Sequence, residues 1–155
     1  MIRFWLFVHL LGFTMWLGGG LASMVAGIAA KREAREGLGA IARSQAAIHK
    51  AIIGPGALLA VLSGLILTFS VSSRMGELIG PSPWLMVMQG AGLLGALLVL
   101  LIGLPTASKL ARLDPTGQAA GYFDELRRRQ RVVGSIAGTL ALLALIAGAL
   151  VRYPT

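Results

Sequence analysis

The sequence predicts an all-α, polytopic membrane protein whose four transmembrane helices form one bundle, with both termini on the outer side of the membrane. Of its 155 residues, 56% are hydrophobic, only 13% are charged and 21 are glycine. A soluble domain of this size cannot bury so many apolar side chains, whereas long apolar stretches rich in glycine are typical of transmembrane helices. Four such stretches are present, and the basic residues between them are unevenly distributed.

The composition also excludes several classes of site. The chain has no cysteine, so disulfides, zinc–thiolate sites, iron–sulfur clusters and thiol catalysis are excluded. The net charge of +8 would suggest nucleic acid as a partner of a soluble chain, but basic residues also collect in the cytoplasmic loops of membrane proteins. We therefore expect membrane lipids, and no nucleic acid, as partners.

Four segments have the length and apolar character of a membrane span, which needs about twenty residues. They comprise residues 4–30, 52–71, 83–104 and 132–151, and together they predict a single domain over residues 1–155. The first segment is expected to be retained rather than cleaved as a signal peptide. Its heavier basic cluster, Lys31 and Arg32, follows the apolar run, whereas a signal peptide carries its charge before the run.

The connections between the spans predict the orientation. The first connection carries Lys31, Arg32, Arg35, Arg43 and Lys50, and the third carries Lys109, Arg112, Arg127, Arg128, Arg129 and Arg131. The middle connection has only Arg74, which Glu77 offsets. Lysine and arginine in short loops favour the cytoplasmic side, so we expect an N-out, C-out protein of the bacterial inner membrane.

The basic connections also contain helix signals. Residues 114–115, Asp-Pro, indicate a turn or a helix start, and acidic residues 124 and 125 favour a new helix that begins near Tyr122. The run "RRRQR", residues 127–131, is interpreted as a cytoplasmic anchor, with an anionic-lipid site as the alternative.

Small residues at a spacing of four occur in every span and predict close helix packing. The stripes are Gly19, Ser23 and Gly27 in the first span; Gly56, Ala60 and Gly64 in the second; Gly92 and Ala96 in the third; and Gly134 and Gly138 in the fourth. They predict a compact four-helix bundle, which a homodimer or a larger membrane complex would extend.

His9 is the main candidate for a site. It lies about six residues, or roughly 9 Å, below the outer end of the first span. Its helical face continues through Gly12, Trp16, Gly19 and Ser23, so the ring is expected to point into the bundle. The side chains expected near its depth are Thr68, Ser70, Met86, Met88 and Gln89.

Two interpretations of this histidine remain open: a structural hydrogen bond across a helix interface, or a ligand or proton role. The second histidine, His49, lies at the cytoplasmic approach to the second span, about 20 Å away along the membrane normal, so the two cannot ligate one haem within one subunit. A haem at His9 would take Met86, Met88, a second subunit's His9, or nothing as its other ligand. His49 itself is interpreted as an interfacial residue beside Lys50. Trp5, Trp84 and Tyr153 are interpreted as interfacial aromatics.

Three segments of the chain resemble a known family. "HLLGFTMWLGG", "IIGPGALLAVLSGLIL" and "PWLMVMQGAGLL" are similar to the first three helices of the bacterial four-helix, haem-binding protoporphyrinogen oxidases. The wider group includes copper-resistance D-like proteins and uncharacterised integral membrane proteins of this length, which are the closer match. The resemblance implies haem binding at His9. The oxidases have a functional lysine where this chain has Gln89, which cannot carry an equivalent charge, so the resemblance leaves catalysis unassigned.

Three functions follow as hypotheses. The first is a redox-associated membrane protein that binds haem b in the outer half of the bundle, with His9 as the metal ligand and Met86, Met88 and Gln89 around the cofactor. The second is a non-enzymatic accessory subunit of a respiratory or photosynthetic complex, packed through its small residues. The third is copper transport, since imidazole and thioether sulfur suit Cu(I).

Overall fold

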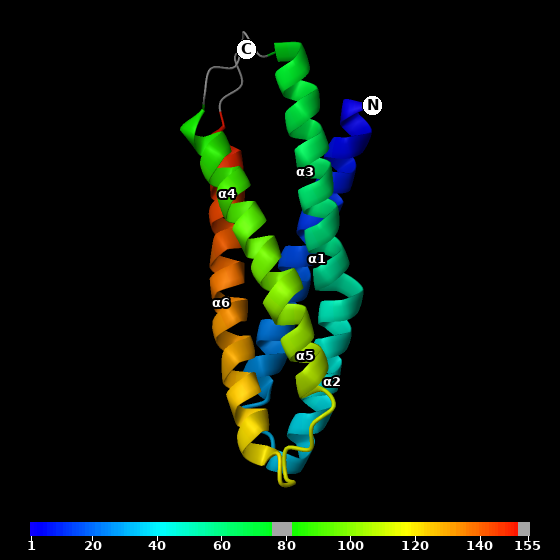
Figure 1. The fold of residues 1–155 in the computed structure, drawn as a ribbon, viewed down its shortest axis with the longest axis vertical. Coiled ribbons are helices and arrows are strands. Elements are labelled where there is room, and N and C mark those ends of the chain that lie inside the picture. Colours follow the sequence, from blue (N-terminus) through cyan, green and yellow to red (C-terminus); the bar gives the residue numbers. More distant parts are fainter. Residues whose placement is uncertain (76–81, 152–155) are drawn as a thin grey trace.

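The computed structural model describes residues 1–75 and 82–151, and regular structure in these residues is entirely helical (Figure 1). The elements are α1 (Ile2–Ala29), a 3₁₀ turn (Arg35–Gly37), α2 (Leu38–Ile48), a π-helical segment (His49–Ile53), α3 (Gly54–Met75), α4 (Pro83–Leu97), a second π-helical segment (Leu98–Gly103), α5 (Leu104–Leu110) and α6 (Ala120–Leu150). The predicted features at Glu77 and Tyr153 lie outside the described residues.

The elements combine into four long helices that are apolar enough to cross a membrane, which confirms the predicted fold class. Their bounds are Ile2–Ala29, Arg35–Ser70, Pro83–Leu110 and Ala120–Leu150. The second, third and fourth are longer than the predicted spans at the end of the bundle that carries the basic connections, which we call the charged end. The beginning of α1 and the end of α6 both lie at the opposite end, which we call the open end (Figure 1).

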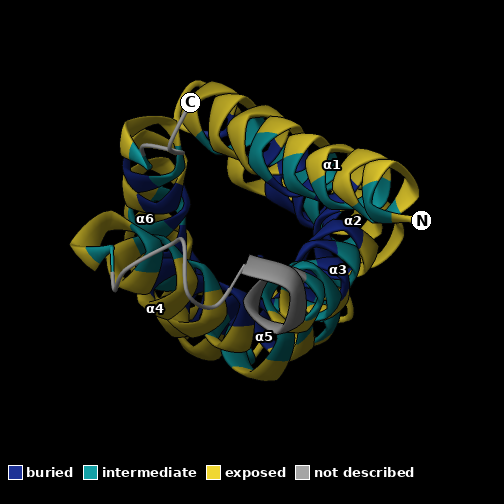
Figure 2. Ribbon diagram, turned by 90° about the horizontal axis from the view of Figure 1, so that it is seen from above, coloured by how far each residue is buried: buried dark blue, intermediate teal, exposed yellow. Residues whose placement is uncertain are grey.

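The four helices are arranged as two pairs. α1 packs most extensively against α3, and α4 against α6. α1 lies along α3 at the open end and crosses toward α6 as it approaches the charged end (Figures 1 and 2). Buried residues line the inner faces of the helices, and exposed residues cover the outside (Figure 2). This outward apolar surface is the pattern expected of a bundle surrounded by lipid.

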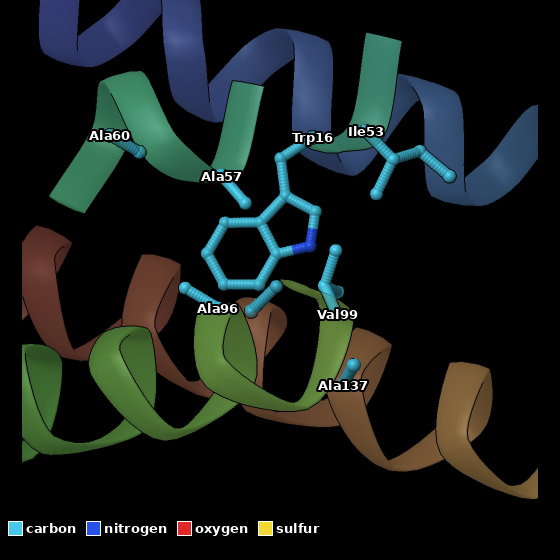
Figure 3. Packing of buried hydrophobic residues seen from close by; sticks show 8 residues of the cluster. Trp16, Ile53, Ala57, Ala60, Ala96, Val99 and Ala137 are labelled. Atoms are coloured by element: carbon cyan, nitrogen blue, oxygen red, sulfur yellow. The ribbon is translucent and has the colours of Figure 1, made fainter. Parts of the chain in front are cut away.

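Trp16 joins the two pairs at the centre of the bundle. Its side chain is 3% exposed, and its indole lies between alanines of α3 on one side and of α4 and α6 on the other (Figure 3). The cluster around it consists of Ile53, Ala57, Ala60, Ala96, Val99, Ala137 and Ala141. One large aromatic side chain surrounded by small ones fills the space between closely packed helices at interior density.

A second core closes the charged end. It contains Ala30, Leu38, Ala42, Leu110, Phe123 and Leu126. Phe123 is 1% exposed, and it lies in the first turn of α6. The helix that was predicted to begin near Tyr122 thus begins at Ala120, and residues 114–115 form a turn rather than a helix start.

The packing stripes agree with the predictions in α1 and α3 and differ in α6. Gly134 and Gly138 face open space, since a Cβ added at either would meet no atom within 4 Å. α6 instead packs through a row of alanines: Ala137, Ala141, Ala144 and Ala147. The stripe prediction was wrong here because alanine, which lacks a long side chain, serves the same purpose as glycine at these contacts.

Candidate functional site

The seam between α1 and α3 is the closest helix contact described here. A Cβ built on Gly12 would lie 2.7 Å from the backbone nitrogen of Ala60, and one built on Gly56 would lie 2.7 Å from the backbone nitrogen of Trp16. The two backbones therefore touch directly, and any larger side chain at either glycine would force them apart. This contact fixes the position of α1 one turn from His9.

His9 lies in this seam, toward the open end. Its Nδ1–H donates to the backbone carbonyl of Ala60 at 2.8 Å and lies 3.3 Å from Oγ of Ser63. A carbonyl oxygen has no proton, so Nδ1 carries the hydrogen, and in the neutral ring Nε2 presents a lone pair. Among the described residues, Nε2 makes no hydrogen bond. The seam thus orients the ring and leaves one basic nitrogen free.

Gly64 makes room for the ring. A Cβ added there would lie 3.1 Å from Cε1 of His9 and 3.3 Å from its Nδ1. The glycine allows the imidazole to lie close to α3, where it donates to the carbonyl of Ala60.

His9 is seven residues before Trp16, so the two side chains share a helical face of α1, and the Trp16 indole lies between α3 on one side and α4 and α6 on the other (Figure 3). An apolar groove of about 380 Å³ opens at this level, lined by Trp5, Val8, Leu59, Leu62, Ser63, Leu65, Ile66 and Phe69. His9 does not line it.

Gln89 and Thr68 form a second polar contact toward the open end. Nε2 of Gln89 donates to Oγ1 of Thr68 at 2.9 Å, which links α4 to α3. Thr68 in turn donates to the carbonyl of Gly64 at 2.9 Å. Because Thr68 lies four residues beyond Gly64, this contact lies about one helical turn farther out than His9. The structure therefore places Gln89 close to the level expected, but bonded to Thr68.

The two methionines of α4 lie on different faces of the helix. Met86 is 69% exposed and lies on the outer surface of the bundle. Met88 is partly buried against α6, where its Sδ lies 3.0 Å from the position of a Cβ on Gly148. Of the residues singled out in the sequence, His9 and Met88 lie within the bundle, Gln89 bridges two helices, and Met86 faces outward.

A second buried polar pair lies near the charged end, and sequence reasoning missed it. His49 is 6% exposed and Gln130 is 8% exposed. Nε2 of Gln130 donates to Nε2 of His49 at 2.7 Å, while Nδ1–H of His49 donates to the carbonyl of Gln45 at 2.9 Å. His49, which was interpreted as an interfacial residue beside Lys50, is buried against α6 at the first residue of the π-helical segment. A usable signal was present: Gln130 is the one uncharged residue of "RRRQR" and lies seven residues after the buried Phe123.

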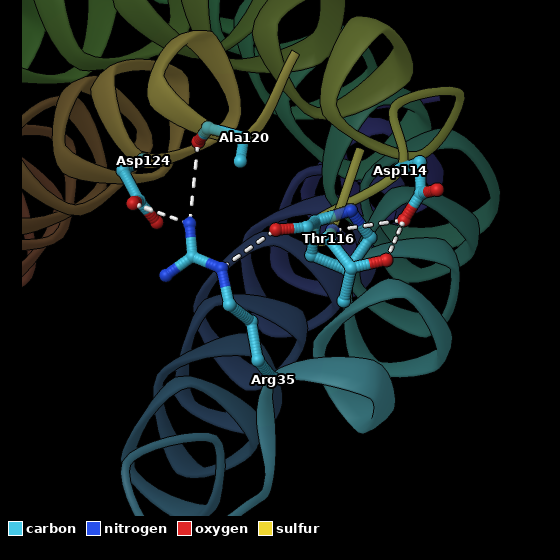
Figure 4. A network of polar contacts seen from close by, with 6 residues as sticks. Arg35, Asp114, Thr116, Ala120 and Asp124 are labelled. Carbon is cyan, nitrogen blue, oxygen red and sulfur yellow. Dashed lines mark hydrogen bonds and ion pairs between the residues drawn. The ribbon is translucent and has the colours of Figure 1, made fainter. Parts of the chain in front are cut away.

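Polar contacts also hold the loops of the charged end (Figure 4). Arg35 donates to the carbonyl of Pro115 and to the carboxylate of Asp124, both at 2.7 Å. In the turn before α6, the backbone N–H and hydroxyl of Thr116 donate to Asp114 at 2.9 and 2.8 Å. These two bonds hold the pKa of Asp114 below its ordinary value, because they favour the ionised carboxylate.

The described residues contain no group of three or more histidine, cysteine, aspartate or glutamate side chains arranged to hold a metal ion.

The fold and the site together define a multi-pass helical membrane protein with a partly buried histidine toward the open end and a buried histidine toward the charged end. Comparison with protein-family models, with curated proteins and with solved structures finds no match to this chain.

Proposed function

We propose that this protein binds haem b within the bundle near its open end, with His9 as the axial ligand and a redox-associated role. The observation that supports the proposal is the state of the His9 ring: Nδ1–H is donated to the carbonyl of Ala60 at 2.8 Å, and Nε2 has no partner among the described residues. Metal-ligating histidines commonly donate their other N–H to such a carbonyl, which fixes the tautomer and raises the basicity of the free nitrogen.

The side chains at the level of His9 are mostly apolar, which suits an apolar cofactor. The groove at this level is lined by apolar residues apart from Ser63, among them Val8 and Leu59. A bound haem would supply one-electron chemistry at its iron. The chain would hold and orient that group, keep water from it through the surrounding apolar side chains, and tune its potential through burial and through the Ala60 bond to His9.

The second ligand remains open between Met88, a second subunit's His9 and none. We leave Met86 out of the proposed ligand set because its side chain faces outward. Gln89 is proposed to close the site from the open end through its bond to Thr68. We further propose that the membrane is the bacterial inner membrane and that the charged end lies in the cytoplasm; the basic connections support this orientation.

The test is an absorption spectrum of the protein purified after expression with ample haem. We expect a Soret band in the wild type, its loss in His9→Ala, and partial recovery of the band in His9→Gly when imidazole is added. Met86→Leu is the matched control and should leave the spectrum unchanged, whereas Met88→Leu should change it only if Met88 ligates the iron. Wild-type protein without haem, or an unchanged band in His9→Ala, would refute the proposal.

The alternative role, an accessory subunit of a larger membrane complex, has support from a different observation. Gly18 and Gly20 on α1, like Gly134 and Gly138 on α6, face open space. Small outward residues allow other transmembrane helices to approach closely. Single cysteines introduced at Gly18 or Gly138 test this role, since the native chain has no cysteine to interfere. Cross-linking to another membrane protein in native membranes supports it, and a chain that remains monomeric there opposes it.

A further inference from the structure

His49 and Gln130 form a buried polar pair that the proposed haem site does not use. The pair connects the π-helical segment His49–Ile53 to α6, and both side chains are more than nine-tenths buried. Oε1 of Gln130 is fully enclosed and has no hydrogen-bond partner among the described residues. Buried polar atoms are almost always paired, so an unpaired one needs an explanation. π-Helical segments such as this one are frequently found at functional sites.

The hydrogen-bond pattern fixes the protonation state of His49 in this arrangement. Nδ1 must carry a proton, because it donates to the carbonyl of Gln45. Nε2 must present a lone pair, because it accepts from the amide nitrogen of Gln130. The ring is therefore neutral, and the amide oxygen of Gln130 is left without a donor.

Rotating the amide of Gln130 by half a turn gives the only other arrangement that keeps both bonds. Oε1 then faces Nε2 of His49 and needs a proton there, while Nδ1 keeps its proton for Gln45. The ring is then an imidazolium cation. A neutral ring with its proton on Nε2 is excluded, because a bare Nδ1 would face the carbonyl oxygen of Gln45 at 2.9 Å.

We propose that His49 and Gln130 form an internal proton-binding site near the charged end, in which the Gln130 amide reverses as Nε2 of His49 takes up or releases one proton. In the neutral state the amide donates; in the protonated state its oxygen accepts, and the unpaired atom gains its partner. The link between α6 and the π-helical segment is kept in both states. The interior of the bundle thereby holds or releases a proton without loss of a helix–helix bond.

The elements around the pair carry several charged side chains. They are mostly cationic: Arg43 on α2, Lys50 in the π-helical segment, Lys109 on α5, and Arg127, Arg128, Arg129 and Arg131 on α6. The acidic exceptions on α6 are Asp124, which is paired with Arg35, and Glu125, which is exposed. On α1 the titratable groups are Arg3 and His9, both toward the open end. Lys50 directly follows His49 in the chain and is exposed, so accessible surface lies one residue away from the buried ring.

The experiment is nitrogen NMR of the full-length protein in lipid bilayers, with labelled histidine and glutamine side chains, recorded over a pH series. At high pH we expect the Nδ1–H tautomer of His49. On acidification both ring nitrogens become protonated, and the side-chain amide signal of Gln130 shifts with the same midpoint. This readout uses the wild-type protein and requires no haem, so its outcome is independent of the proposed role of His9.

Two variants sharpen the test. In Gln130→Met the imidazolium loses its acceptor, so the proton concentration at which His49 is half protonated should rise about tenfold. The matched control Gln89→Met removes an exposed glutamine from α4 and should leave the His49 titration unchanged. The Nε2–H tautomer at high pH, a Gln130 amide signal that does not follow His49, or equal titrations in the two variants would overturn the proposal.

Discussion

Gly64 of α3 lies against the imidazole of His9 on α1, so closely that a Cβ at residue 64 would lie 3.1 Å from Cε1 of the ring. The position of the histidine ring therefore depends on the glycine. Four residues before Gly64 on α3, the carbonyl of Ala60 accepts the hydrogen bond from Nδ1 of His9 at 2.8 Å. Helix packing and ring orientation depend on the same few atoms.

Gly64→Ala should displace the ring without unfolding the bundle. The added Cβ pushes Cε1 and Nδ1 away by a few tenths of an ångström and lengthens the bond to Ala60, which is worth about 1 kcal/mol net. We expect a loss of stability of up to that amount, and faster exchange of the Nδ1 proton by NMR. Gly92→Ala on α4 is the control, since its Cβ would meet only the Cβ of Ala144, at 4.0 Å. Equal behaviour of the two variants would contradict the close fit.

Gly12→Ala should be much more damaging than Gly18→Ala, although both glycines lie on α1. The Cβ at Gly12 would lie 2.7 Å from a backbone nitrogen and 2.9 Å from the carbonyl oxygen of Gly56, atoms that cannot move without separating the helices. Overpacking of this kind costs about 1–3 kcal/mol. At Gly18 no atom lies within 4 Å, so the change should be within about 0.5 kcal/mol. Thermal unfolding in detergent measures both, and comparable losses would show that the seam tolerates separation.

The sequence was sufficient to predict the architecture because a lipid bilayer requires each crossing segment to be a long apolar helix. Apolar length predicted four helices, and helical spacing predicted that His9 shares the packed face of Gly12 and Trp16. The contacts across helices were less accessible. Spacing alone placed Met86 and Met88 near one level, but they lie on different faces of α4, and only Met88 packs toward α6.

The sequence did not predict that His49 and Gln130 are buried and in contact with each other. Each residue lies beside basic neighbours, so composition assigned both to the membrane surface. Both are buried, and they meet where the π-helical segment packs near α6, an irregularity that has no simple sequence signal. The alanine row of α6 was missed as well, because the stripe of the fourth span was assigned to Gly134 and Gly138, which face open space.

Thr116→Val should raise the pKa of Asp114 toward its ordinary value. The variant removes the hydroxyl donor at 2.8 Å and keeps the backbone donor at 2.9 Å, so part of the effect should remain. Because the bonds hold the pKa of Asp114 down in the folded state, their contribution is present at neutral pH. It is lost as the pH falls below about 4. Carbon NMR of the carboxyl group measures the midpoint, with Glu125 as an internal reference. An unchanged midpoint would mean that the hydroxyl does not hold the carboxylate.

Arg35→Ala should loosen the connection that precedes α6. Arg35 donates to the carbonyl of the buried Pro115 at 2.7 Å and to Asp124 at 2.7 Å (Figure 4). Its side chain and that of Asp124 are 45% and 50% exposed. An exposed ion pair contributes at most about 1 kcal/mol, and a hydrogen bond about as much, so we expect a total loss of about 1–2 kcal/mol. Proteolysis within residues 111–119 should accelerate, since the arginine ties that turn to the rest of the bundle.

Asp124→Asn and Arg32→Ala separate the parts of this effect. The asparagine keeps an oxygen acceptor and removes only the charge, so it should cost less than Arg35→Ala and remove the part of the salt dependence of stability that this ion pair contributes. Arg32 lies in the same connection, is exposed, and makes no side-chain bond among the described residues, so its removal should be neutral. If Asp124→Asn is as damaging as Arg35→Ala, the ion pair is the main contact and the Pro115 carbonyl contributes little. If Arg35→Ala matches Arg32→Ala, the turn before α6 is held by the Phe123 core alone.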